Sequence, residues 1–280
     1  MRITKILNNN AVVVLDENQE KIAIGAGVAF QKKKNDLVNQ HKIEKLFVMD
    51  GSEKVQQLQQ LIERIPEEHF TISEEIIAYA ERVLGSKLND HIHIVLTDHI
   101  SFAIERTIDG IHLKNKLFQE IKILYKTEFE IGLWAIQLIK EKLNVDMPVD
   151  EAAFLALHIH TMKMQGGSLR KTVKYMMIVR EMVGYIQEYL PNIVFEEDDI
   201  AYQRLITHLH FTLARAEHDE MHTMDKEMID MMRKKFQSSF ECGIFISDKL
   251  RMNHQIELSD EEIGFISLHI ERLSKHSFNK

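Results

Sequence analysis

The chain has 280 residues, of which 45% are hydrophobic and 28% charged, with a formal net charge of −8. This composition supplies sizeable cores for two or three domains and excludes an intrinsically disordered chain. A single cysteine, Cys242, excludes a disulfide framework and a cysteine-based zinc finger. No apolar run approaches the roughly 20 residues of a membrane span, and residues 1–15 lack a signal peptide's apolar core. We therefore expect a cytoplasmic protein without membrane insertion.

Charge is divided unevenly along the chain. Residues 1–55 carry 9 Lys and Arg against 7 Asp and Glu, whereas residues 56–170 and 171–280 each have a net charge of −5. Neutralising nucleic-acid phosphates requires basic side chains, so the total charge excludes a broad electrostatic grip on DNA. A slightly basic head thus precedes two acidic bodies of similar size.

The head has the texture of a small β-sheet. Val and Ile with partial alternation predict four short strands joined by short turns, one of them the polar turn at 16–19. The predicted strands are Met1–Leu7, Ala11–Leu15, Lys21–Gly25 and Ile43–Met49. About 50 residues in such a sheet bury little surface, so we expect the head to form a two-fold dimer.

Helical periodicity begins after residue 55. Val55, Leu58, Leu61 and Ile62 keep helical spacing, which favours a helical linker over residues 56–65. Further helices are predicted at Glu74–Leu84, Asn115–Tyr125, Phe129–Leu143, Glu151–Met164, Lys171–Leu190, Asp199–Glu217, Asp225–Phe236 and Glu261–Leu273. The expected domains are residues 1–55, 66–170 and 171–280.

The two bodies are related by an internal repeat. Segment 150–159 (DEAAFLALHI) matches 261–270 (EEIGFISLHI), and FEIG at 129–132 matches FECG at 240–243, both at an offset of 111. Segment 99–106 (HISFAIER) matches 208–215 (HLHFTLAR) at an offset of 109. The fold class is therefore multidomain: a four-stranded antiparallel β head followed by two homologous all-α helical bundles.

Each body keeps two equivalent histidines. His99 aligns with His208 and His158 with His269, whereas His160 aligns with Glu271 and His210 with Ser101. A histidine on an apolar helix face is usually a packed residue, but His158 and His269 each follow a Phe by four residues, at the edge of the apolar stripe. A titratable ring placed there in both repeats has the ingredients of a switch.

Metal binding and enzyme catalysis find little support. The candidate ligand pairs are His91 with His93, His158 with His160, and His208 with His210. Residues two apart on a helix point about 200° apart, so only the first pair could chelate, and only on a strand. The sequence has no nucleophile elbow, phosphate-binding loop or dinucleotide-binding turn. We expect no cofactor, no metal site and no enzyme activity.

Covalent phosphorylation of the rings is the remaining specific alternative. It would add about two negative charges, which could repel a partner subunit or pair with an arginine. Arg106 and Arg215 each lie seven residues after the first histidine of their repeat. The residues alone leave phosphohistidine and packed histidine both open.

The chain resembles the BglG/SacY family of bacterial transcriptional antiterminators over essentially its whole length. The resemblance rests on the opening MRITKILNNNA, on GAGVAFQKKK at 25–34, and on the two histidine-bearing repeats. It implies a dimeric co-antiterminator RNA-binding head and two regulation domains controlled by the sugar phosphotransferase system. It also implies phosphorylation at His99, His158, His208 and His269.

The resemblance also supplies the RNA-contacting candidates, which are Lys5, Asn8, Asn10, Gly25, Ala26, Gly27 and Phe30. Asn amides suit base edges and 2′-hydroxyls, glycines permit close approach, and an aromatic ring can stack on a base. A polar turn and a hairpin are the structural alternatives for the Asn and Gly runs. Some family members carry an Arg between the two glycines, where this chain has Ala26.

The implied function is regulatory. The head would bind a ribonucleic antiterminator hairpin in nascent mRNA, the sugar-specific permease enzyme II would phosphorylate the first domain and inhibit, and the phosphocarrier HPr would phosphorylate the second and activate. A DNA-binding regulator with the same regulation domains is the alternative, and it requires a helix-turn-helix head. A purely structural scaffold is a third possibility.

Overall fold

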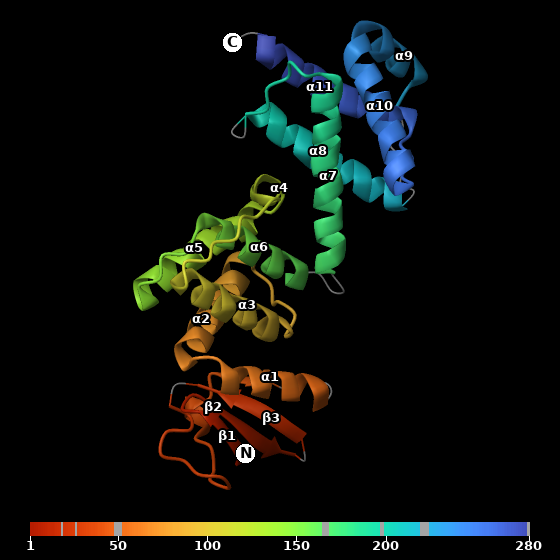
Figure 1. Cartoon of the computed structure of the whole chain (residues 1–280). Helices are drawn as coiled ribbons and strands as arrows, with labels where there is room; N and C mark the ends of the chain where they lie inside the picture. The colour runs from red at the N-terminus through yellow and green to blue at the C-terminus, as the bar shows by residue number, and fades with distance from the viewer. Residues whose placement is uncertain are drawn as a thin grey trace. The chain divides into compact units, whose positions relative to one another are not determined.

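A computed structural model describes residues 1–17, 19–25, 27–47, 52–163, 168–196, 199–218 and 224–278, and the side chains among them other than those of 52–56 and 276–278. In these residues four strands precede eleven α-helices (Figure 1), which confirms the predicted fold class. The chain divides into two compact units. The first comprises Met1–Asn115 and Thr127–Gly167, and the second comprises Lys116–Lys126 and Ser168–Lys280.

The head is an antiparallel sheet with the strands in sequence order. Its strands are β1 (Arg2–Asn8), β2 (Ala11–Asp16), β3 (Gln19–Ile24) and β4 (Lys45–Phe47), with a 3-10 turn η1 (Gln40–Lys42) before β4. Alternation along β2 gives two apolar faces, because Val12 and Val14 pack on one face while Ala11 lies on the other. This sheet is not the helix-turn-helix that the DNA-binding alternative requires.

A helix covers one face of the sheet. Helix α1 (Ser52–Arg64) buries Leu58, Leu61 and Ile62 in the same cluster as Ile22 of β3. Pro66 then stands at the N-cap of α2 (Glu67–Leu84), where its lack of an N–H costs no helical hydrogen bond. Phe70 of α2 belongs to the same cluster, so the head and the first helical bundle share apolar packing within one unit.

Four helices form the core of the first bundle. They are α2, α3 (Ile92–Ile108), α5 (Lys126–Leu143) and α6 (Val149–Lys163). Helices α5 and α6 approach closely at Gly132, where a Cβ would lie 2.2 Å from the carbonyl oxygen of Ala152. An alanine at position 132 would push the two helices apart, which explains the glycine in the repeated FEIG segment.

Two sequence expectations about residues 91–125 need correction. The helix predicted over 115–125 is shorter, α4 (Phe118–Leu124), because the Asn115 N–H donates to Asp150 Oδ1 at 2.7 Å and the chain before α4 is held as a loop. The strand considered for His91 and His93 is wrong, since His91 caps α3 and His93 lies in its first turn.

The second unit repeats the four-helix arrangement. Its core is formed by α7 (Leu169–Tyr189), α8 (Ile200–His218), α10 (Gln237–His254) and α11 (Asp260–Phe278). Helix α9 (Lys226–Lys235) packs against α10 and α11, while Ile123 and Leu124 of α4 pack against this core. No described helix combines the length and apolarity needed to span a membrane.

Candidate functional site

The asparagine turn and the glycine loop of the head form one surface. The Asn10 backbone N–H donates to Asn8 Oδ1 at 2.8 Å, and Asn10 Oδ1 accepts from the Gly27 N–H at 2.6 Å. The Gly25 N–H donates to the Asn10 carbonyl oxygen at 3.0 Å. These bonds tie the β1–β2 turn to the loop after β3, so residues far apart in sequence meet at one end of the sheet.

The two glycines of this loop are there for different reasons. A Cβ at Gly25 would lie 1.8 Å from the carbonyl oxygen of Lys42, so no side chain fits. Gly27 has φ +61°, and it accepts a 3.2 Å hydrogen bond from Lys42 Nζ through its carbonyl oxygen. Lys42, which the sequence did not single out, thus places a positive charge at the loop. Ala26 lies outside the described residues.

Phe30 and Lys5 lie in contrasting surroundings. Phe30 is 60% exposed, and its aromatic face can accept a stacked base. Lys5 instead forms a 2.6 Å ion pair with Glu63 of α1. Among the candidate RNA-contacting residues, the structure therefore groups Asn8, Asn10, Gly25 and Gly27 and places Lys5 against the covering helix.

The first helical bundle brings His99 of α3 beside His158 of α6. Their ring centroids are 4.8 Å apart. Glu151, at the start of α6, is fully buried and lies between two partners: Arg106 Nη2 is 2.5 Å from its Oε1, and His99 Nε2 is 3.4 Å from its Oε2. A carboxylate paired with Arg106 thus lies close to one ring of the histidine pair.

The second bundle repeats this arrangement. The ring centroids of His208 and His269 are 4.7 Å apart. Glu262 accepts hydrogen bonds from Arg215 Nε and from the Thr212 hydroxyl, each at 2.7 Å, and its Oε2 is 3.9 Å from His208 Nε2. Two independent packings of the repeat therefore produce the same pair of histidines with the same buried acid and arginine.

Burial sets the charge of the second histidine in each pair. Desolvation, with a further contribution from His99, lowers the pKa of His158 to about 4. Burial also lowers the pKa of His269, as do the charges of Arg272 and Arg204. Both rings are neutral at pH 7 and keep a lone pair, the form in which an imidazole acts as a nucleophile.

The buried glutamates remain ionised. Burial raises the pKa of Glu151, but hydrogen bonds from His99 and Arg106 outweigh that effect, so the pKa lies below its usual value. The pKa of Glu262 also lies below its usual value, because hydrogen bonds from Arg215 and Thr212 outweigh the effect of burial. Arg106 and Arg215 are therefore paired with carboxylates and are not available to a phosphate, contrary to the role that sequence spacing suggested.

Sequence reasoning missed the two glutamates although the signal was present. Glu151 and Glu262 are identical residues at the repeat offset of 111, in the same segments that revealed the histidines. The other histidines take separate places, with His160 Nδ1 lying 3.2 Å from Glu128 Oε1. The described residues contain no cluster of three or more side chains that could hold a metal ion.

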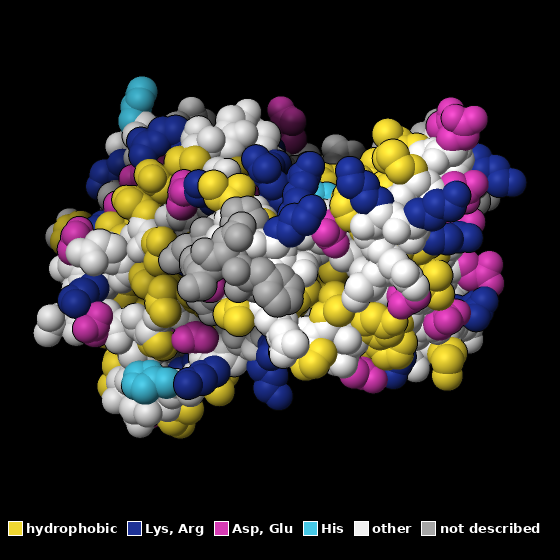
Figure 2. Space-filling view, turned by 90° about the horizontal axis from the view of Figure 1, so that it is seen from above, with side chains coloured by type: hydrophobic (Ala, Val, Ile, Leu, Met, Phe, Trp, Pro, Cys, Tyr) yellow, Lys and Arg dark blue, Asp and Glu magenta, His cyan; other side chains and the backbone are white. Residues whose placement is uncertain are grey.

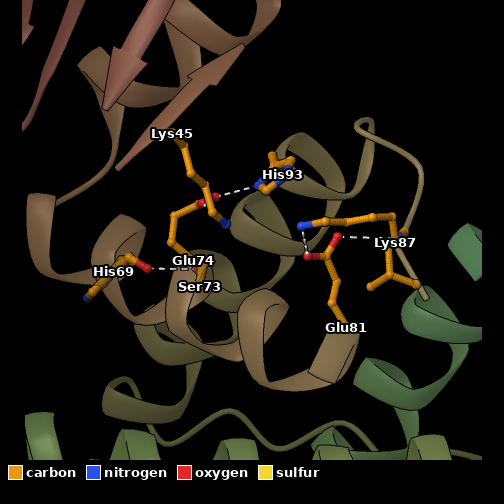
Figure 3. Close-up of polar contacts among 8 residues, drawn as sticks. Lys45, His69, Ser73, Glu74, Glu81, Lys87 and His93 are labelled. Atoms are coloured by element: carbon orange, nitrogen blue, oxygen red, sulfur yellow. Dashed lines mark hydrogen bonds and ion pairs between the residues drawn. The ribbon is translucent and has the colours of Figure 1, made fainter. Parts of the chain in front are cut away.

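A further polar cluster joins the head to the first bundle (Figure 3). One carboxylate oxygen of Glu74 in α2 lies 2.7 Å from Lys45 Nζ of β4. The other oxygen lies 2.6 Å from His93 Nδ1 of α3. Burial raises the pKa of Glu74. The hydrogen bond from His93 and the charges of His93 and Lys45 have the larger opposite effect, so this pKa lies below its usual value. The ring of Phe47 meets that of His93 edge to face at 4.5 Å. These contacts fix strand β4 against α2 and α3.

Comparison with known proteins agrees with this architecture. Residues 1–56 match the model of the CAT RNA binding domain, and residues 74–162 and 175–273 match that of the PRD domain. The chain belongs to the BglG/SacY family of transcriptional antiterminators. The predicted resemblance is thereby confirmed, and the two helical bundles are PRD domains.

Named relatives extend over the whole chain. The transcription antiterminator LicT of Bacillus subtilis (strain 168) is 36% identical over 279 residues, covering 99% of this chain and 100% of the relative. The beta-glucoside operon antiterminator of Dickeya chrysanthemi is 36% identical over 275 residues, covering 98% and 96%. The crystal structure of GlcT CAT-PRDI is 34% identical with a TM-score of 0.54, covering 59% of this chain and 98% of that one.

Proposed function

We propose that this protein binds, as a dimer, an antiterminator hairpin in nascent mRNA of a sugar-utilisation operon, and that histidine phosphorylation by the sugar phosphotransferase system regulates it. The joined surface of the asparagine turn and glycine loop supports RNA binding. The Asn8 and Asn10 amide oxygens hold the surface together, and it offers closely approachable backbone and the exposed ring of Phe30, which suit unpaired bases and the shallow groove of RNA. The slightly basic head would then recognise RNA by shape and hydrogen bonding.

The observation that carries the regulatory part is the repeated histidine pair. In each PRD domain a neutral ring lies beside a second ring that is within 4 Å of a buried glutamate, with His158 beside His99 and His269 beside His208. Phosphorylation at either pair would add about two negative charges next to a paired acid. We propose that enzyme II modifies the first pair and inhibits, and that HPr modifies the second pair and activates.

The phosphates would act through the dimer equilibrium. A charge can shift an equilibrium only by its differential interaction with the two states. We propose that charge at His99 or His158 disfavours a closed dimer that aligns two heads, and that charge at His208 and His269 favours it. The full chain then couples phosphorylation of the PRD domains to RNA affinity.

Aspartate substitutions test this proposal in the full chain. His208→Asp with His269→Asp should raise both dimer content in analytical ultracentrifugation and affinity for the hairpin, whereas Asp at His99 or His158 should lower both. The matched control is His210→Asp, because His210 lies on α8 but has no histidine counterpart in the first repeat. If none of the four positions responds beyond this control, the histidines are packed core residues.

A further inference from the structure

The second histidine pair opens onto a cavity that has a basic wall. The cavity has a volume of about 480 Å³ and lies within the second unit. Its lining residues are Ile123, Ile200, Gln203, Arg204, Thr207, His208, Phe211 and His269. Thr207 and His208 follow Arg204 by three and four residues, and Phe211 follows them by four and three, so α8 presents all four on one face.

Arg272 provides a second guanidinium group near the His269 ring. Arg272 follows His269 by three residues on α11, and both Arg272 and Arg204 act electrostatically on His269. Among the described residues neither arginine has a carboxylate within ion-pair distance, in contrast to Arg215. Arg204 therefore lines the cavity, and Arg272 lies about one helical turn from His269, whose neutral, nucleophilic ring also lines it.

The equivalent positions beside the first pair carry no arginine. At the repeat offsets of 109 and 111, Val95 stands where the second repeat has Arg204, Asp98 where it has Thr207, and Thr161 where it has Arg272. The cavity near this face of α3 is lined by acidic Asp98 and Glu105 together with Arg64. The two PRD domains thus share their histidines and glutamates but differ in the charge beside them.

We propose that Arg204 and Arg272, together with His269, form a phosphoryl-binding site in the second PRD domain, and that the first PRD domain lacks this site. Guanidinium groups match phosphate oxygens in charge and in hydrogen-bond geometry. On the face shown in Figure 2, exposed Lys and Arg side chains are interspersed with acidic and hydrophobic ones, and the areas of histidine surface are small. This inference rests on the proposed phosphorylation and names residues that would bind the phosphoryl group at the second pair.

The transfer that this site would assist is balanced in atoms and charge. The lone pair of the neutral His269 ring attacks phosphorus, and the P–N bond of the donor breaks. The leaving nitrogen keeps the bonding pair and takes up a proton, while the His269 ring loses the proton from its other nitrogen. The arginines bind the phosphoryl oxygens throughout and orient the phosphorus toward the ring.

Phosphate titration of the full chain tests the binding site without any protein donor. The chain is labelled with ¹⁵N at histidine, and inorganic phosphate is added at constant ionic strength. We expect saturable shifts of the His208 and His269 ring signals and none for His99 and His158. Arg204→Gln with Arg272→Gln should weaken the affinity about tenfold, whereas the control Arg251→Gln on α10 should bind like the wild type. An equal response from both pairs, or wild-type binding by the double variant, overturns the proposal.

Phosphorylation by phosphoramidate then tests whether the site assists phosphoryl transfer or binds only free phosphate. Mass spectrometry of the full chain should show the second pair modified faster than the first, and the double variant should lose about tenfold of that rate. Equal rates at the two pairs count against the inference. If phosphate binds as expected but phospho-HPr never modifies the second domain, the proposed function fails while the binding site stands.

Discussion

Removing the negative charge from the first histidine site should strongly destabilise the first unit. Glu151→Gln leaves the Arg106 guanidinium, which is only 6% exposed, without its charged partner. Breaking a buried ion pair from one side costs about 3–5 kcal/mol, because the remaining charge stays desolvated. With a urea dependence of about 2 kcal/mol per M, the unfolding midpoint should fall by about 2 M.

The chain provides a specific probe for this measurement. Trp134, its single tryptophan, lies on α5 and stacks on Tyr79 of α2 with ring centroids 3.7 Å apart. Its fluorescence therefore reports the first bundle. The equivalent change Glu262→Gln belongs to the second unit and should leave the Trp134 transition unaltered.

A double substitution separates the charge effect from a packing effect. Glu151→Leu with Arg106→Met removes both charges, and should restore most of the lost stability because no unpaired charge stays buried. The reasoning is refuted if Glu151→Gln shifts the Trp134 midpoint by less than about 0.5 M, or if the double variant is as unstable as the single one.

Three further outcomes follow from the described geometry. Between pH 6.5 and 4 the His158 ring is protonated in the unfolded chain but neutral in the folded one. The free energy of unfolding of the first unit should therefore fall by about 3 kcal/mol as the pH decreases through this range. His158→Gln should remove this part of the pH dependence, measured by Trp134 fluorescence. Gly25→Ala should abolish hairpin binding in a gel-shift assay because its Cβ would overlap backbone, while Gly27→Ala should cost about 1 kcal/mol and retain binding; equal effects would contradict the distinction. Phe30→Ala should weaken hairpin binding by about 1–3 kcal/mol with unchanged thermal unfolding, since the ring is exposed, and undiminished affinity would exclude stacking.

The sequence by itself determined the domain types and the repeat. Alternating Val and Ile in residues 1–25 specify strands, and helical periodicity specifies the bundles, because both patterns follow from which face of an element is buried. Matching His99 to His208 and His158 to His269 needed only self-comparison. The same comparison also matches Glu151 to Glu262. The sequence does not show, however, which of the matched residues contact each other.

Only the tertiary structure decided how the charges pair. Arg106 and Arg215 have the sequence spacing of phosphate ligands, yet each is neutralised by a glutamate from another helix, which spacing along one helix does not reveal. The tertiary structure also places Lys42 at the glycine loop and Arg204 at the second histidine pair. Periodicity records burial along each element, whereas ion pairing depends on which elements meet.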